Sequence, residues 1–237
     1  MSSTNFTFEI ISAAGVTDTM LKESATMFSS AYGVWGPLAA QKMGKFFKMS
    51  VDRLREQSLA PGSNSVLVRG LAGDKLAGYA FATRWDYEGR QICWVTQLCV
   101  GPEFRRQKLA TQILIHLREG EKDRGFGIMS SHPAAILGAL RAWGRGIEEV
   151  NLNMVKEHAA GIMAASPVTY IKNAVLKGSV FGKGDDTVCC ADTGFWVDHT
   201  EPLQALATVK DRGVEWPFGD LSEGCEFLIL VKSAEVD

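Results

Sequence analysis

The chain lacks several features that would assign it to a class of protein at once. Its 237 residues contain no uninterrupted apolar run of membrane-spanning length, and the opening MSSTNFTFEI has neither the basic start nor the long apolar stretch of a secretory signal peptide. The formal net charge is only −2 at pH 7, so no overall field attracts nucleic acid or an anionic membrane. We therefore expect no membrane and no nucleic-acid partner, and any cationic site must be local.

Cysteine and histidine are also scarce. The five cysteines include the adjacent pair Cys189 and Cys190, which does not suit a framework of disulfides and favours a reducing, cytoplasmic location. The four histidines are scattered, and no pair of Cys or His has the spacing of zinc ligands. We expect that the protein holds no metal.

What is present is the composition of an ordinary globular protein, with 46% hydrophobic and 22% charged residues. A chain of this length can bury a sizeable core. No repeat, low-complexity tract or linker divides it, so we expect a single domain over residues 1–237.

The hydrophobic periodicity predicts strands and helices in alternation, which indicates a mixed α/β fold. Strands are expected at 6–12, 66–69, 76–84 and 90–100, at GFGIMSS, and finally in DTVCCADTGFWVDH and CEFLILVK. Helices are expected around 21–28, over 43–54, from the basic turn after Val100 to about Arg124, at HPAAILGALRAWG and at EPLQALATVKDRG. Residues 146–186 are expected to form a helical insertion that is broken near Pro167.

The stretch CVGPEFRRQKLATQILIHL, Cys99–Leu117, is the most informative for chemistry. An apolar strand runs into a proline-containing turn, three cations follow (Arg105, Arg106 and Lys108), and an amphipathic helix begins. A helix start offers unpaired N–H groups and about half a positive charge, which suits a phosphate group. On charge alone, the segment is either a phosphate-binding loop or a solvated basic helix start.

The order of residues in LCVGPEFRRQKLA resembles the acetyl-CoA motif of the GCN5-related N-acetyltransferase (GNAT) superfamily, L-x-V-x-P-x-x-R-(R/G)-x-G-x-(G/A). The matching residues are Leu98, Val100, Pro102, Arg105, Arg106 and Ala110. The resemblance covers about residues 64–146 and implies a twisted, mainly antiparallel mixed sheet, flanked by helices and split next to the cofactor. It also implies acetyl-CoA as acyl donor, bound by Leu98, Cys99, Val100, Arg105, Arg106, Gln107, Lys108, Leu109, Ala110 and Thr111.

Two positions depart from the family pattern. Lys108 replaces the glycine that lets the backbone approach the pyrophosphate, although its ammonium can compensate with an ion pair. The tyrosine that protonates the departing thiolate in the family aligns with Ala139, so that general acid is absent. The family also stabilises the thioester oxygen with a backbone N–H, which the resemblance places near Val100, where the strand is expected to bulge.

The expected catalytic residue is His132, at the start of the helix after GIMSS, with helix capping as its alternative role. Tyr170 and His199 are further candidates, although nothing in the sequence brings them to the site. Cys99 lies within the motif, but no base is positioned to activate it, so we expect a buried apolar side chain there.

For the acceptor, the resemblance indicates AYGVWGP and GFWVDHTEP as the flanking segments. Tyr32, Trp35 and Trp196, together with Phe195, are expected to form an aromatic wall, and Asp198 is expected to attract an ammonium group. The same aromatic residues also fit a role in the core of an enlarged domain.

The resemblance thus implies an acetyl-CoA-dependent N-acetyltransferase that acts on a primary amine of a small molecule or peptide, by direct attack in a ternary complex. Two alternatives stay open: a non-catalytic acyl-CoA-binding protein, favoured by Lys108 and Ala139, and an interaction module that retains only the scaffold.

Overall fold

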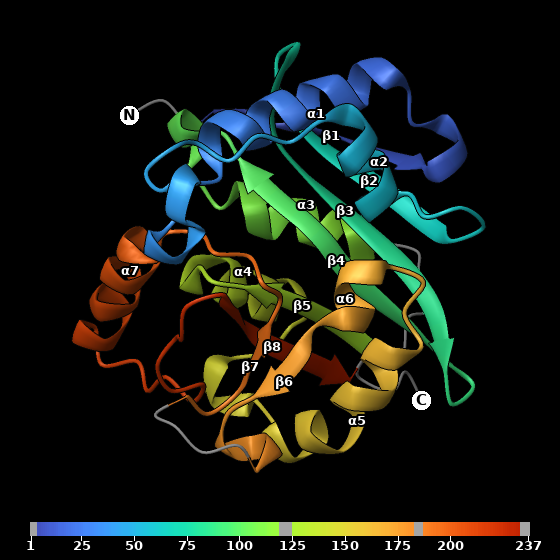
Figure 1. Ribbon diagram of the computed structural model, residues 1–237. Coiled ribbons are helices and arrows are strands. Elements are labelled where there is room, and N and C mark those ends of the chain that lie inside the picture. The colour runs from blue at the N-terminus through green and yellow to red at the C-terminus, as the bar shows by residue number, and fades with distance from the viewer. Residues whose placement is uncertain (1–3, 119–124, 183–186, 233–237) are drawn as a thin grey trace.

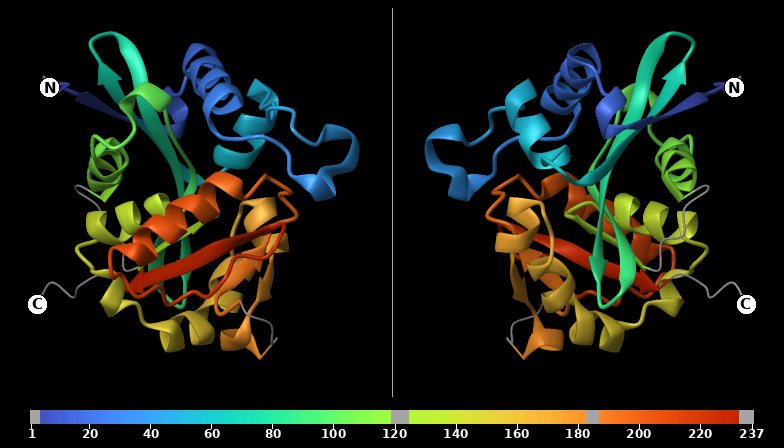
Figure 2. Two further views of the ribbon diagram at one scale, coloured as in Figure 1. Left: turned by 90° about the vertical axis from the view of Figure 1, so that its left-hand side faces the viewer. Right: turned by 90° about the vertical axis from the view of Figure 1, so that its right-hand side faces the viewer.

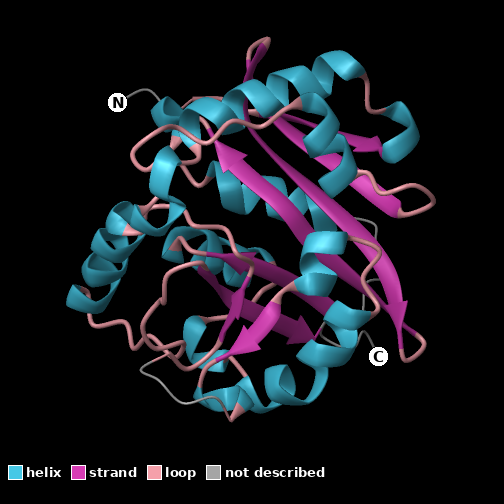
Figure 3. Ribbon diagram, in the orientation of Figure 1, coloured by secondary structure: helices cyan, strands magenta, loops and turns pink. Residues whose placement is uncertain are grey.

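The computed structural model describes residues 4–118, 125–182 and 187–232, which are built around one eight-stranded sheet (Figures 1 and 3). The strands are β1 (Thr7–Ser12), β2 (Asn64–Ala72), β3 (Lys75–Tyr87), β4 (Arg90–Val100), β5 (Gly125–Ser130), β6 (Val175–Lys177), β7 (Cys190–Asp192) and β8 (Cys225–Lys232). Their order across the sheet is β1-β2-β3-β4-β5-β8-β7-β6, and the β4–β5 pair is parallel while its neighbours are antiparallel. The predicted mixed, mainly antiparallel sheet is confirmed.

Helices cover both faces of this sheet. They are α1 (Asp18–Ala31), α2 (Val51–Ser58), α3 (Leu109–Arg118), α4 (Pro133–Ala142), α5 (Leu152–Ala164), α6 (Thr169–Asn173) and α7 (Thr200–Asp211). Figure 2 shows α1 and α2 on one side of the β2–β3–β4 strands and α3 on the other. Side chains alternate between these layers along β2, where Leu67 joins the α1–α2 cluster while Val66 and Val68 join the α3 cluster.

The first helix forms as its sequence predicts. The hydroxyl of Thr17 accepts a hydrogen bond from the amide of Met20 at 3.3 Å and so caps the helix start. Leu21, Ala25 and Phe28 recur at helical spacing and are all buried against the sheet.

The predicted helix over residues 43–54 is wrong. Residues Pro37–Lys42 form a short 3-10 helix, Gly44 then takes a φ of 72°, and Phe46 pairs with Val34 in an isolated β-bridge. The helix α2 begins only at Val51, after its cap Ser50. The apolar spacing misled because Met43 and Phe46 are 63% and 55% exposed and do not share a buried face with Phe47.

Two further expectations need adjustment, and others fall outside the described residues. The end of the predicted helical insertion forms the strand β6, and the strand predicted in DTVCCADTGFWVDH is only three residues long in β7. The described part of α3 ends at Arg118, so its predicted extension to Arg124 lies outside the described residues, as do 183–186 of the insertion.

The sheet splits between β4 and β5. The two strands pair from Ile92 with Gly125 to Val95 with Ile128 and then separate. Beyond that point β4 continues against β3 alone, and β5 continues against β8 alone. The split leaves the backbone of both strands facing an open space in the middle of the molecule.

The paired part of β4 and β5 depends on a glycine. A Cβ on Gly127 would lie 2.3 Å from the ring of Trp94, which is fully buried. We expect Gly127→Ala to lower the free energy of unfolding by about 1–3 kcal/mol or more, because neither the strand nor the ring has room to move. Urea unfolding measures this.

The matched control is Gly138→Ala on α4. A Cβ there would make an ordinary contact with the Thr111 hydroxyl at 3.4 Å, and alanine favours the helix by up to about 1 kcal/mol. Equal stability of the Gly127→Ala variant and the wild type would contradict the tight β4–β5 packing.

Candidate functional site

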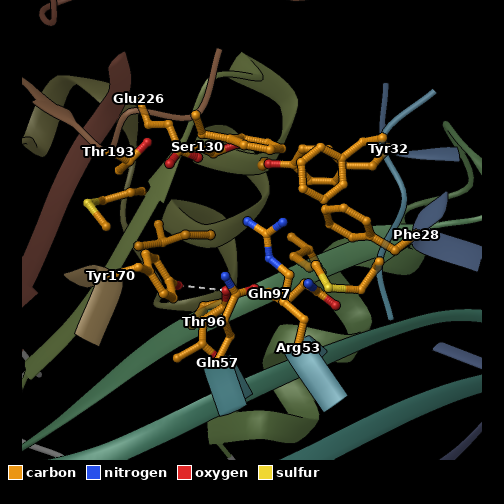
Figure 4. Close-up of a pocket in the computed structure, with 18 of the residues that line it drawn as sticks. Phe28, Tyr32, Arg53, Gln57, Thr96, Gln97, Ser130, Tyr170, Thr193 and Glu226 are labelled. Atoms are coloured by element: carbon orange, nitrogen blue, oxygen red, sulfur yellow. Dashed lines mark hydrogen bonds between the residues drawn. The ribbon is translucent and has the colours of Figure 1, made fainter. Parts of the chain in front are cut away.

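A cavity of about 190 Å³ lies at the split of the sheet (Figure 4). Its floor includes Thr96 and Gln97 from β4 and Met129 and Ser130 from β5, the residues just beyond the last paired positions. The remaining lining comes from segments distant in the sequence: the end of α1, the loop before α2, α2 itself, α6, the loop after β7, and β8. In that order, these residues are Phe28 and Tyr32; Trp35, Phe47 and Met49; Arg53 and Gln57; Tyr170; Thr193, Gly194 and Phe195; and Glu226.

A β-bulge shapes the β4 wall. The register against β3 pairs Val95 with Ala82 and Gln97 with Phe81, which leaves Thr96 as the extra residue. The Thr96 carbonyl accepts a hydrogen bond from the Tyr170 hydroxyl at 2.7 Å. The bulge was expected near Val100 and that position is wrong, because Val100 is in regular register opposite Gly78.

Glu226 of β8 is a carboxyl group buried in this cavity, and its residue is only 8% exposed. Burial raises the pKa of Glu226 to about 7, because the charged form loses its hydration. The Thr193 hydroxyl lies close enough to oppose this rise, yet its oxygen makes no hydrogen bond of good geometry within the described residues. Glu226 therefore exchanges its proton near neutral pH, as a general base must.

Two tyrosines lie close enough to this carboxyl group to be affected by its charge. Burial raises the pKa of both Tyr32 and Tyr170 above the usual range, and the nearby charge of Glu226 adds to each rise. Tyr32 is half-buried as a whole residue, but its hydroxyl is enclosed by protein. Both hydroxyls stay protonated at physiological pH, so they act as hydrogen-bond donors.

The predicted aromatic wall is present in part. Tyr32 and Trp35 line the cavity, and Phe47 and Phe195 complete the wall, with ring centroids 4.6 Å apart. Trp196 and Asp198 are not among the residues that line the cavity. Asp198 accepts a hydrogen bond from the Thr200 amide at 2.9 Å and so caps the first turn of α7.

The basic loop before α3 has an unusual backbone. Arg106 and Lys108 have φ angles of 62° and 63°, a left-handed conformation that glycine adopts more easily. The Lys108 carbonyl receives the Gln112 amide at 3.0 Å, so the amides that precede Gln112 in the first turn are not used by the helix itself. Lys108 thus keeps the backbone shape of the glycine that it replaces.

The three cations of this loop differ in their contacts. Arg106 and Lys108 are exposed and make no ion pair within the described residues. Arg105 instead donates to the Glu201 carboxylate of α7 at 3.0 Å and to the carbonyl of Ala31 at the end of α1. The loop therefore offers two free cations and a set of amides for an anion such as a pyrophosphate.

The other expected cofactor-binding residues surround this loop. Leu98 lines the cavity, Gln107 donates to the Glu103 carbonyl, and Leu109 is buried under the helix start. Val100, Ala110 and Thr111 are half-buried, while Cys99 is 5% exposed. Burial raises the pKa of the Cys99 thiol to about 12, so it carries no thiolate at neutral pH.

His132 caps the helix α4. Its Nδ1 accepts the amide of Ala134 at 3.1 Å, and its Nε2 lies 3.9 Å from the Glu201 carboxylate. Burial lowers the pKa of His132, against the opposing effect of Glu201, so the ring is neutral at physiological pH. It is not among the residues that line the cavity. Ala139, which aligns with the tyrosine of the family motif, is fully buried in the core.

Sequence reasoning missed Glu226 and Arg53, and it left Tyr170 without a location. Glu226 stands alone in the apolar strand CEFLILVK, where a charged residue at an interior-facing position was the available signal. Tyr170 reaches the cavity from α6, inside the predicted insertion. The third candidate, His199, is 4% exposed, and burial lowers its pKa, but it does not line the cavity.

Among the described residues, no group of three or more His, Cys, Asp or Glu side chains is placed to hold a metal ion. No described helix is both long enough and apolar enough to cross a membrane. The five cysteines all lie in the described residues, are buried and form no disulfide.

The fold and site together define a mixed α/β protein with a split sheet, a bulged strand at the split and a basic loop before the following helix. Comparison with protein families agrees: the Acetyltransferase (GNAT) family model matches residues 35–136, from Trp35 to the first turns of α4. The resemblance of this chain to the GNAT superfamily, first indicated by the motif, is confirmed.

Several solved structures are similar to part of the chain. Escherichia coli ElaA is 12% identical, with 55% of this chain and 81% of that chain covered and a TM-score of 0.40. An acetyltransferase from Thermus thermophilus is 15% identical, with the same shares covered and a TM-score of 0.40. An aminoglycoside acetyltransferase from an uncultured soil metagenomic sample, in complex with sisomicin, is 12% identical, with 48% and 68% covered and a TM-score of 0.35. No curated protein sequence matches the chain.

The burial of Glu226 predicts a pH-dependent stability difference. Its pKa of about 7 in the folded state is above the ~4.3 of an exposed glutamate, so folding favours the protonated form. The stabilisation is complete below the unfolded pKa and is lost as the pH rises through about 7. We expect Glu226→Gln, which does not titrate, to be about 3–4 kcal/mol more stable than the wild type at pH 8, and nearly equal to it near pH 4.5.

Chemical unfolding at the two pH values measures this difference. Glu223→Gln, which changes an exposed carboxyl three residues earlier, is the matched control and should show no such trend. A stability difference for Glu226→Gln that is independent of pH would contradict the raised pKa.

Proposed function

We propose that the chain is an acetyl-CoA-dependent N-acetyltransferase that transfers an acetyl group to a primary amine of a small molecule or peptide, by direct attack in a ternary complex. The observation that carries this proposal is the cavity at the β4–β5 split, which contains a buried carboxyl group with a pKa near neutrality. The free amides and cations of the loop before α3 begin at the end of the same strand.

The residues of that loop fit a CoA pyrophosphate. The left-handed φ at Arg106 and Lys108 turns the backbone at the helix start, and both side chains are free to pair with phosphate oxygens. When bound, acetyl-CoA supplies an activated acetyl thioester. Leu98 and the bulge at Thr96 then form the wall beside which the acyl group is expected to lie.

We assign the role of general base to Glu226 in place of His132. An alkylammonium group has a pKa of about 10, so an acceptor amine must lose a proton before it attacks. Glu226, ionised above its pKa of about 7 and enclosed in the cavity, accepts that proton directly or through a water molecule. His132 uses its Nδ1 to cap α4 and lies outside the lining of the cavity.

Tyr170 is proposed as a positioning residue. Its hydroxyl donates to the Thr96 carbonyl and so fixes the bulged part of β4. The hydroxyl proton of Tyr170 is used in this hydrogen bond. The position aligned with the family's tyrosine is Ala139, so no side chain there can protonate the departing thiolate. The departing thiolate is a weak base, because the pKa of its thiol is about 8.5, and protonation of the thiolate by water suffices.

Titration calorimetry with acetyl-CoA and CoA, followed by thiol-release assays against a panel of primary amines, tests the proposal. Thiol release that requires both acetyl-CoA and an amine supports it. Tight binding without release across the panel favours a non-catalytic acyl-CoA-binding protein, and absence of binding favours an interaction module. The adjacent cysteines Cys189 and Cys190 do not suit a disulfide framework, so we propose a reducing, cytoplasmic compartment for the reaction.

Lys108 tests the CoA-binding role of the loop. We expect Lys108→Ala to weaken acetyl-CoA binding about five- to thirty-fold, because one charged hydrogen bond is lost while the left-handed backbone keeps its cost. Lys108→Gly should bind more tightly than the alanine variant, since glycine adopts a φ of 63° without strain. Calorimetry at low and high salt measures both effects, and the loss should shrink with salt.

The control is Lys22→Ala, which removes an exposed lysine on α1. If Lys108→Ala binds acetyl-CoA like the wild type at low salt, the lysine does not contact the phosphates.

Glu226 tests the catalytic proposal. For the wild type, kcat/KM should rise with pH through about 7, because only the ionised carboxylate accepts a proton. Glu226→Gln should lower kcat about 100-fold or more and remove this inflection, while acetyl-CoA affinity stays unchanged. An inflection near pH 7 that persists in Glu226→Gln, with undiminished kcat, would assign the base to another group.

A further inference from the structure

Two of the described residues that line the cavity have ionisable side chains that are charged slightly above neutral pH: Arg53, a cation, and Glu226, an anion. They come from α2 and β8, on separate sides of the cavity, as Figure 4 shows. The rest of the lining is aromatic, aliphatic or neutral polar. A ligand that fills the cavity therefore meets one cation and one carboxylate at different places.

The guanidinium group of Arg53 lies over an aromatic ring. Its guanidinium carbon lies 5.0 Å from the centroid of the Phe47 ring, and Phe47 is itself only 2% exposed. Trp35 and Phe195 pack around Phe47, with ring centroids 4.7 and 4.6 Å from it. The guanidinium points toward the middle of the cavity (Figure 4).

Arg53 has no carboxylate partner among the described residues, although other arginines of the same region do. Arg55, two residues later on α2, pairs with Asp18, and Arg69 pairs with Glu9 and Glu23. Arg53, which is exposed, instead leaves its planar set of N–H donors without a carboxylate where it lines the cavity. A guanidinium so placed matches a carboxylate in a two-pronged hydrogen bond.

The size of the cavity limits what its ligand can be. At about 190 Å³ it is smaller than the ~300–1,000 Å³ of pockets for drug-sized ligands, so a small molecule fits more readily than a large one. The aromatic wall formed by Tyr32, Trp35, Phe47 and Phe195 favours an apolar side group on that molecule.

We propose that the acceptor is a free amino acid with an apolar side chain, bound with its amine toward Glu226 and its carboxylate on Arg53. This assignment rests on the proposed function for its chemistry, but the binding that it predicts does not require turnover. The two charges of the amino acid are the reverse of the two charges in the cavity, so the fixed charges orient the amine toward the base.

The test uses matched ligands that differ at the carboxylate. L-Phenylalanine, L-leucine and L-methionine are each compared with the carboxamide and with the corresponding amine that lacks the carboxyl group, with CoA present for calorimetry and acetyl-CoA for thiol release. The amine of each carboxamide has a lower pKa than the amine of the corresponding free acid. A preference for the free acid over the carboxamide therefore cannot come from easier deprotonation of the amine. We expect the free acids to bind about ten- to a hundred-fold more tightly than either analogue.

Arg53→Met keeps the apolar stem and removes the charge. It should raise the Kd and KM for the free acid about ten- to a hundred-fold, while those for the carboxamide change little. Arg55→Met on the same helix is the matched control and should leave both unchanged, and thermal unfolding checks that both variants fold. The difference should also shrink at high salt.

The outcomes separate the two proposals. If amines are acetylated but acid and carboxamide behave alike in the wild type and in Arg53→Met, the amino-acid assignment is overturned while the transferase stands. If free acids bind through Arg53 but no thiol is released, the cavity is an amino-acid-binding site, while the transferase proposal and the acceptor role fail. If no amino acid binds at millimolar concentration, the assignment is overturned whatever the activity.

Discussion

The site depends on one interruption of backbone pairing. β4 and β5 hydrogen-bond as parallel neighbours up to Val95 and Ile128 and then diverge, so polar main-chain groups are left at the centre of the sheet. Such groups are costly when buried without partners. One of them, the Thr96 carbonyl, is satisfied by the Tyr170 hydroxyl, which holds the bulged strand in place while the space beside it stays open. The cavity thus exists because the two strands diverge.

The chemistry of the cavity comes from two parts of the chain. The segment that matches the GNAT family model, residues 35–136, contributes β4, the basic loop and Arg53. Tyr170, Thr193 and Glu226 lie after that segment, on α6, the loop after β7, and β8. The first part therefore contributes the loop proposed to bind the cofactor, while the last strand contributes the carboxyl group proposed as base. A buried carboxyl without a cation is destabilising, so its presence at this position is best explained by function.

The sequence predicted features that depend on neighbouring residues. The strand at 90–100 coincides with β4, the helix α1 follows its apolar spacing, and the motif around Arg105 identified the loop. The features that it did not predict depend on distant contacts. In the sequence, Glu226 is only a single acidic residue in an apolar segment. The pairing of β8 with β5 places it near Tyr32 and Tyr170. The false helix over 43–54 shows the same limit, because helical spacing cannot reveal that Met43 and Phe46 face solvent.

Arg105 connects three parts of the molecule that sequence separates. It lies in the basic loop, it pairs with Glu201 near the start of α7, and it donates to the carbonyl of Ala31 at the end of α1, next to Tyr32 of the cavity wall. If a ligand in the loop drew this guanidinium toward itself, Arg105 would give up its contacts with Glu201 of α7 and with the end of α1, the helix that carries Phe28 of the cavity lining. Coupling of this kind is reciprocal: the factor by which a ligand in the loop changes the affinity for a ligand in the cavity equals the factor in the opposite direction. One arginine thus links the occupancy of the loop to the occupancy of the cavity.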